Sequence, residues 1–165
     1  MDNLTEPFVE LIRRAATDLP PDVEAALRNA RDREASGSAA QGALDTVLDN
    51  VAIARENATP ICQDTGVPIF YVRIPGAPSQ GNGTDDLARV STRHLQAHME
   101  AAVAEATRRS YLRPNAVDPV TGRNSGNNLG KGFPSFHFEE WDEDAIAVDL
   151  LLKGGGSENV STQIK

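Results

Sequence analysis

The chain contains a single cysteine, Cys62, and the residues directly after it can bind metals or transfer protons. The segment reads Cys62-Gln63-Asp64-Thr65-Gly66. A thiolate can act as a nucleophile, a metal ligand or a redox group. The alternative is a buried thiol with only a packing role. That role would not need an amide, a carboxylate and a hydroxyl next to the thiol, so we treat this segment as the first candidate site.

Asp64 is the candidate for proton transfer in the same segment. A carboxylate beside a metal-bound water or hydroxyl can act as a general acid or base. The alternative is a role in the backbone turn, because the order Asp-Thr-Gly is typical of turns. Both interpretations of Asp64 stay open at this point.

A second candidate site follows an apolar strand near residue 153 and reads Lys153-Gly154-Gly155-Gly156. Consecutive glycines let backbone N–H groups approach an anion closely, and the lysine adds positive charge. The glycine and lysine order of a P-loop is absent. The alternative to an anion site is a flexible connector.

Arg113 is the candidate for binding a carboxylate, because a guanidinium can pair with a carboxylate through two parallel hydrogen bonds. The chain has a formal net charge of −8. An acidic protein that binds an anionic ligand must supply positive charge locally, from a few placed groups. A surface arginine without this role is the alternative.

The three histidines give weaker signals. His94 and His98 are spaced i, i+4 on an expected helix and share one face, a pattern that can bind zinc. No acid lies between them in a metalloprotease pattern, so a polar helix face is the alternative. His137 lies between Phe136 and Phe138 and is expected on the opposite, solvated face of a strand. No Cys–His pair that would activate a nucleophile emerges.

Composition excludes several classes of protein. The chain has 165 residues, of which 39% are hydrophobic, enough for one domain with a core. It contains no apolar run long enough to span a membrane, and its acidic N-terminus lacks the apolar core of a secretory signal. A single cysteine cannot form an internal disulfide, which indicates a cytoplasmic setting. Lysine is scarce, which argues against a nucleic-acid-binding surface.

Hydrophobic periodicity and turn residues predict the elements that position these candidates. The expected helices cover residues 6–17, 21–35, a third segment that ends near 57–60, and 84–109. The expected strands cover residues 67–74, 135–140 and 145–152, with the last two forming a hairpin around 142–144. The predicted fold class is therefore mixed α/β, with N-terminal helices, then a strand, a long helix and further strands of a sheet.

Four segments, taken in order, resemble the α catalytic region of the class I iron–sulfur fumarate hydratases and the related L-tartrate dehydratases. No single segment is specific, but the combination is, and it spans essentially the whole chain. The segments are Cys62-Gln63-Asp64-Thr65-Gly66, Tyr111-Leu112-Arg113, Asp118-Pro119 and Lys153-Gly154-Gly155-Gly156-Ser157.

The resemblance implies a hydro-lyase that interconverts fumarate and malate, a reaction of the tricarboxylic acid cycle, and carries a [4Fe-4S] cluster. An open iron of the cluster would act as a Lewis acid. Cys62 matches the first cluster cysteine, and Gln63 and Asp64 match residues that contact the substrate near that iron. Arg113 matches an arginine that binds a substrate carboxylate, and Gly156 matches a backbone contact to the substrate.

The chain departs from the family in its cysteine count, since the family uses three cluster cysteines and this chain has one. We therefore expect residues 1–165 to be the N-terminal part of a single α catalytic domain, truncated at its C-terminal end. The general base would come from a β subunit or a fused β region, within an oligomer that binds a small dicarboxylate. The alternative is a short natural chain that is degenerate or takes the missing ligands from a partner.

Three rival functions remain. An L-tartrate dehydratase would use the same chemistry on a different hydroxyl pattern. A non-catalytic α/β module for protein interaction or anion binding would explain the missing cysteines and base. An enzyme with a cysteine nucleophile is the third, although no histidine is placed by the sequence to activate Cys62.

Overall fold

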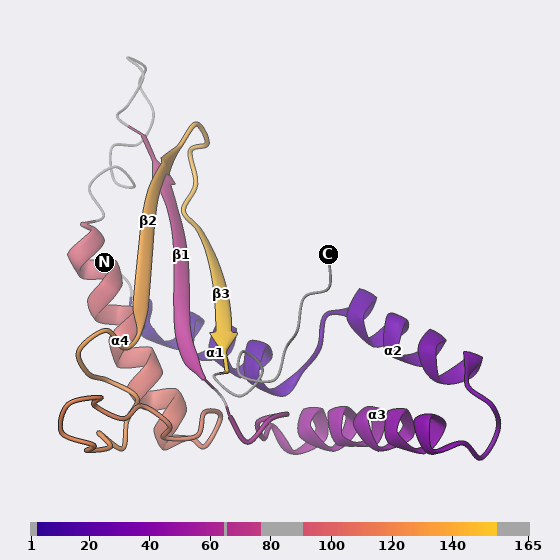
Figure 1. Cartoon of the computed structure of the whole chain (residues 1–165). Helices are drawn as coiled ribbons and strands as arrows, with labels where there is room; N and C mark the ends of the chain where they lie inside the picture. The colour runs from indigo at the N-terminus through magenta and orange to yellow at the C-terminus, as the bar shows by residue number, and fades with distance from the viewer. Residues whose placement is uncertain (1–2, 65, 77–90, 155–165) are drawn as a thin grey trace, which may run out of the picture.

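The computed structural model describes residues 3–64, 66–76 and 91–154, which form four helices and three strands (Figure 1). Gly156, and the expected start of the long helix at residues 84–86, lie outside the described residues. The elements, in order, are α1 (Thr5–Thr17), α2 (Pro21–Arg33), α3 (Ala39–Asn57), β1 (Val67–Pro75), α4 (Thr92–Arg108), β2 (Ser135–Trp141) and β3 (Ala147–Lys153). The mixed α/β fold class predicted from the sequence is confirmed.

The sheet has the strand order β2-β1-β3, with β1 parallel to β2 and antiparallel to β3. The predicted hairpin between the last two strands is therefore wrong, because β1 lies between them. The reason is burial: Phe70 and Val72 of β1 are fully buried, whereas the described side chains of β2 and β3 are at most partly buried. The most apolar strand occupies the centre of the sheet.

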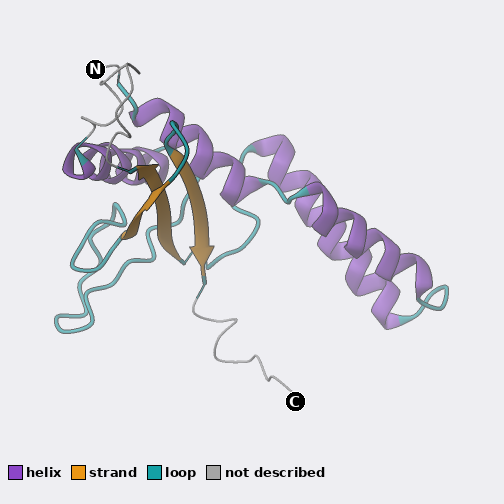
Figure 2. Ribbon diagram, turned by 90° about the horizontal axis from the view of Figure 1, so that it is seen from above, coloured by secondary structure: helices purple, strands orange, loops and turns teal. Residues whose placement is uncertain are grey.

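Helices α1 and α4 pack together on one face of this sheet, as Figure 2 shows. Their apolar residues recur at helical spacing, so each helix presents one apolar stripe to the sheet. The buried core combines residues of α1, β1, α4 and the segment after α4, namely Phe8, Val9, Ile12, Ala16, Phe70, Val72, Leu95, Met99, Ala102, Val103, Ala106 and Leu112.

The opposite face of the sheet carries polar and aromatic side chains. Tyr71 stacks on His137, with 4.9 Å between ring centroids. Arg73 lies 4.7 Å from the ring centroid of Trp141 and forms a 2.8 Å ion pair with Asp149. His137 is exposed, as expected from its alternation with two phenylalanines.

Helices α2 and α3 lie side by side and extend away from the sheet (Figures 1 and 2). We call this pair the α2–α3 arm. The buried side chains of α3 are Val51 and Ala54, in its second half, and α2 has no buried residue. Ser38 caps α3, since its hydroxyl accepts a hydrogen bond from the N–H of Gln41 at 3.1 Å. The arm is therefore held mainly by contacts within itself.

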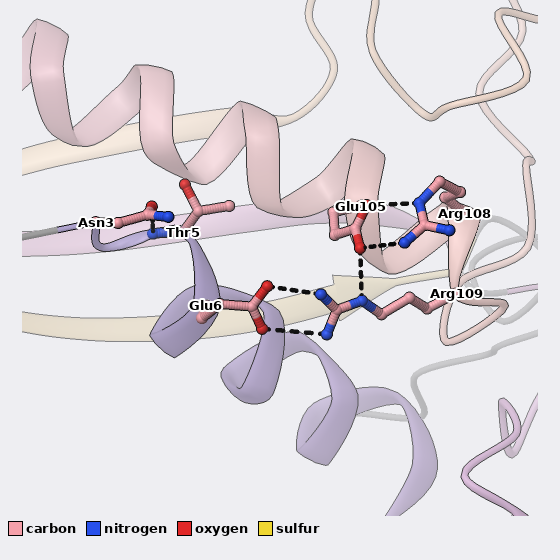
Figure 3. A network of polar contacts seen from close by, with 6 residues as sticks. All are labelled: Asn3, Thr5, Glu6, Glu105, Arg108 and Arg109. Carbon is pink, nitrogen blue, oxygen red and sulfur yellow. Dashed lines mark hydrogen bonds and ion pairs between the residues drawn. The ribbon is translucent and has the colours of Figure 1, made fainter.

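A polar network joins α1 to the end of α4 (Figure 3). Glu6 and Arg109 form two hydrogen bonds, of 2.6 and 3.1 Å, across the two helices. Glu105 accepts further hydrogen bonds from Arg108 and Arg109, and these guanidinium groups lower the pKa of Glu105 to about 2. The network fixes the C-terminal end of α4, from which the loop carrying Arg113 continues.

None of the helices in the described part of the chain is both long enough and apolar enough to cross a membrane.

Candidate functional site

Cys62 lies on the loop between α3 and β1, which we define as the Cys62 loop (residues 61–66). Two hydrogen bonds anchor its start: the N–H of Ile61 donates to the carbonyl of Ala16 at 3.0 Å, and Asn50 Nδ2 donates to the carbonyl of Ile61 at 2.9 Å. Cys62 itself is exposed. The alternative of a buried packing thiol is therefore wrong, and the thiol is accessible for chemistry.

Asp64 closes the turn in this loop, because its Oδ1 accepts a hydrogen bond from the N–H of Gly66 at 3.1 Å. This contact bears out the turn role foreseen for Asp64. It occupies one carboxylate oxygen, and a carboxylate has lone pairs for further partners. The turn role thus orients the carboxylate and leaves its proposed chemistry open.

The end of β3 lies directly against the Cys62 loop. Gly66 has a φ of +73°, and a Cβ atom there would lie 2.0 Å from the carbonyl oxygen of Lys153. A Cβ atom on Gly154 would lie 3.2 Å from Oδ2 of Asp64. The two candidate segments, which lie far apart in the sequence, therefore meet, and only a glycine at position 66 permits this approach.

Arg113 lies on a third segment, which we define as the Arg113 loop (residues 113–116). The segment follows buried Leu112, and the side chain of Arg113 is exposed. Asn115 Nδ2 donates a hydrogen bond to the carbonyl of Gln63 at 3.4 Å. The Arg113 loop thus contacts the Cys62 loop, and the two loops and the end of β3 gather at one end of the sheet (Figure 1).

Asn128 organises the Arg113 loop, a role that was not predicted from the sequence. Its side chain is buried and makes four hydrogen bonds. The available signal was weak: an asparagine in a loop rich in Asn and Gly suggests a left-handed backbone conformation, and Asn128 has a φ of +59°. The sequence could not reveal its partners, which precede it by 12–21 residues.

Asp118, from another segment of the recognised pattern, has a structural contact. Its carboxylate accepts hydrogen bonds from the N–H groups of Thr121 at 2.7 Å and Val120 at 2.9 Å. These N–H groups lower the pKa of Asp118. Asp118 therefore holds a turn together as an ionised group.

His94 and His98 share a helix face, as expected, and their Nε2 atoms lie 3.1 Å apart. His98 Nδ1 lies 2.9 Å from the hydroxyl oxygen of Thr5. Both rings are partly buried, so the pair belongs to the contact between α1 and α4. The zinc-site alternative has no third ligand in residues 3–64, 66–76 and 91–154, where no group of three His, Cys, Asp or Glu could hold a metal.

Comparison with known proteins places the whole pattern in one family. Residues 5–165 match the family model described as Fumarate hydratase (Fumerase). A protein named as a class I fumarate hydratase from Geobacillus stearothermophilus is 40% identical over 163 residues, which are 99% of this chain and 29% of that protein.

Two further relatives carry a different substrate in their names. One, named as the α subunit of L(+)-tartrate dehydratase from Methanocaldococcus jannaschii, is 34% identical over 96% of this chain and 53% of its own length. Its namesake from Escherichia coli strain K12 is 31% identical over 94% of this chain and 48% of its own length. The chain thus spans about half or less of the length of these relatives.

Proposed function

Because this chain belongs to the fumarate hydratase family, we propose that it supplies the N-terminal part of the catalytic α region of an iron–sulfur hydro-lyase. The reaction is the reversible addition of water to fumarate to give malate. Residues 1–165 form part of a single α domain, which works with a β subunit or a fused β region in an oligomer. The relatives named as α subunits support this partner, and cluster cysteines that stay reduced would fit a cytoplasmic setting.

The observation that carries the proposal is the meeting of three segments at one end of the sheet. The Cys62 loop contacts the end of β3 through Gly66 and Gly154, and it contacts the Arg113 loop through Asn115 and Gln63. These segments lie far apart in the sequence. A thiol, a carboxylate and a guanidinium are therefore carried on segments that contact one another.

The chemistry of Cys62 fits one ligand of the cluster, because its thiol is exposed and thiolates are the usual ligands of iron–sulfur clusters. Further ligands would have to lie outside the described residues, which contain no group of three potential ligands. When bound, the cluster would supply a Lewis acid for the hydroxyl and a carboxylate of the substrate.

The remaining roles belong to side chains of this chain. The exposed Arg113 side chain would hold a substrate carboxylate through paired hydrogen bonds. Gln63 would orient the substrate by hydrogen bonding, and backbone N–H at Gly156 would contact an anionic oxygen. Asp64 would hold or move a proton at its carboxylate, whose orientation is fixed by the N–H of Gly66.

The test uses the native assembly that contains this chain, prepared without oxygen. Cys62→Ser should abolish both cluster retention, measured as iron and sulfide per chain, and hydration of fumarate. Asp64→Asn is the matched comparison in the same loop: it should retain iron and sulfide and lose most of its kcat, because the amide cannot accept a proton. Full activity of Cys62→Ser would remove Cys62 as a ligand, and an unchanged kcat in Asp64→Asn would remove its proton-transfer role.

The second candidate function is dehydration of L-tartrate, which the names of the relatives at 34% and 31% identity favour. Steady-state kcat/KM values on malate and on L-tartrate, measured on the same preparation, separate the two. A higher value on tartrate would assign the chain to the second activity. An assembly that contains neither iron nor sulfide and turns over neither substrate would favour a non-catalytic module.

A further inference from the structure

We infer that Asn128 is the positioning residue of the substrate site, because it fixes the backbone that carries Arg113. The inference rests on the proposed function, in which Arg113 binds a substrate carboxylate. Asn128 is assigned no contact with substrate, so its role is exerted through the Arg113 loop.

The side-chain amide of Asn128 holds this loop from both ends. Its Nδ2 donates to the carbonyl oxygen of Arg113 at 2.8 Å. Its Oδ1 accepts from the N–H groups of Asn115 at 2.9 Å and Ala116 at 3.0 Å. The amide thus adds three side-chain hydrogen bonds to a loop that also has a backbone hydrogen bond, from the N–H of Asn115 to the carbonyl of Arg113 at 2.9 Å.

A fourth hydrogen bond ties the amide to the body of the protein. Nδ2 of Asn128 donates to the hydroxyl oxygen of Thr107 at 3.0 Å, and that hydroxyl donates to the carbonyl of Val103 at 2.8 Å. Both residues are buried in α4. With two donated and two accepted bonds, the amide uses its whole hydrogen-bonding capacity, and it links the Arg113 loop to a helix of the core.

Burial makes this arrangement costly to replace. Asn128 is 1% exposed, and loss of its side chain would remove the hydrogen bond to the N–H of Ala116 and leave the N–H of Asn115 with its 2.9 Å hydrogen bond to the carbonyl of Arg113. An unsatisfied buried polar group is unfavourable, so the loop would move to find new partners. Since Asn115 also contacts the carbonyl of Gln63, such movement would change how Arg113 lies relative to the Cys62 loop.

The adjacent asparagine supplies a matched control. Oδ1 of Asn127 accepts a hydrogen bond from the N–H of Leu129, two residues away. No contact of its side chain with the Arg113 loop occurs in the described residues. Asn127→Ala therefore removes the same chemical group one position earlier and leaves the contacts of the Arg113 loop in place.

The experiment measures KM and kcat for fumarate and malate in the native assembly, for wild type, Asn128→Ala, Asn128→Asp and Asn127→Ala. Asn128→Ala should raise KM about tenfold or more, the scale on which misplaced positioning groups act. Asn128→Asp should raise KM less than Asn128→Ala does. It loses both donated hydrogen bonds but keeps the oxygen that accepts from Asn115 and Ala116. A purely structural defect would lower the active fraction, and with it the apparent kcat, at an unchanged KM.

Amide hydrogen exchange in the same variants gives an independent readout. Exchange at Asn115 and Ala116 should become faster in Asn128→Ala and stay at the wild-type rate in Asn127→Ala. If Asn128→Ala does not fold, the KM of the isosteric variant Asn128→Asp is compared with that of the wild type instead.

The outcomes separate the inference from the proposed function. A raised KM in both Asn128 variants with a wild-type KM in Asn127→Ala supports the inference. If the wild type hydrates fumarate but both Asn128 variants keep the wild-type KM, the inference is overturned and the proposed function is unaffected. A wild type that turns over no hydroxy dicarboxylate overturns both.

Discussion

Gly66 and Gly126 have nearly the same positive φ angle in very different surroundings. Their φ angles are +73° and +76°. A Cβ atom on Gly66 would lie 2.0 Å from the carbonyl oxygen of Lys153, whereas one on Gly126 would meet no atom within 4 Å. An alanine at Gly126 therefore measures only the cost of a positive φ angle, whereas an alanine at Gly66 adds the cost of a steric clash with β3.

We expect Gly126→Ala to lower the free energy of unfolding by roughly 1–2 kcal/mol, the cost of a left-handed conformation for a residue with a Cβ atom. Gly66→Ala should lower it by clearly more, because backbone atoms of β3 cannot make room and the Cys62 loop must leave the sheet. Urea unfolding of both variants measures the difference. Equal losses would show that the Cys62 loop is not seated on β3 in solution.

At the residue scale, the groups that can do chemistry were predictable from the sequence, whereas the side chain that holds the Arg113 loop was not. The reactive character of Cys62, Asp64 and Arg113 depends on residue type, which the sequence states directly. The role of Asn128 depends on hydrogen bonds to Thr107 and to the Arg113 loop, which the fold alone brings together. An asparagine in a polar loop has no local feature that reveals such partners.

At the scale of elements, the C-terminal end of α4 is held by ion pairs of Glu105 with Arg108 and Arg109, and its stability should depend on pH. The folded-state pKa of Glu105 is about 2, lowered by hydrogen bonds from Arg108 and then Arg109 from the ordinary value of 4.5. A lowered folded-state pKa means that this stabilisation is fully present above about pH 4.5 and is lost as the pH falls towards 2.

We therefore expect the free energy of unfolding to fall between pH 4.5 and pH 2, and to fall less steeply in Glu105→Gln. The difference should be modest and should shrink at high salt, because these groups are close to solvent. Urea unfolding at a series of pH values measures it. If Glu105→Gln keeps the wild-type slope, the network does not form in solution.

The elements themselves were predicted well, and their pairing was not. Helix 6–17 and strand 67–74 were predicted within about one residue of α1 and β1, because amphipathic spacing is a local property. The predicted hairpin of β2 and β3 does not form. A short connection makes two strands neighbours in the sheet only when no other strand is a better partner for them. Buried Phe70 on β1 pairs with Phe136 on one side and Leu150 on the other, and this long-range burial outweighs the local connection.

At the scale of the whole molecule, stability should be unevenly distributed. The α2–α3 arm has two buried residues, both in α3, whereas α4 alone has six. Segments with few buried apolar contacts open at low free energy, and core helices open close to the free energy of global unfolding.

We accordingly expect amides of α2 to exchange with solvent much faster than those of α4. Hydrogen exchange followed by mass spectrometry, on peptides from Pro21–Arg33 and Thr92–Arg108, gives both rates in one sample. Equal protection of the two helices would mean that the arm is covered by other parts of the native assembly.

The central place of β1 has a consequence during synthesis on the ribosome. This strand begins at Val67, whereas its partners follow much later and the second of them ends at Lys153. At a typical rate of 5–20 residues per second, β1 waits roughly 4–17 seconds for the sheet to be completed. Until α4, β2 and β3 have been made, in that order, the elements that bury Phe70 and Val72 are incomplete, so the nascent chain presents an apolar segment to which chaperones that recognise exposed hydrophobic residues can bind.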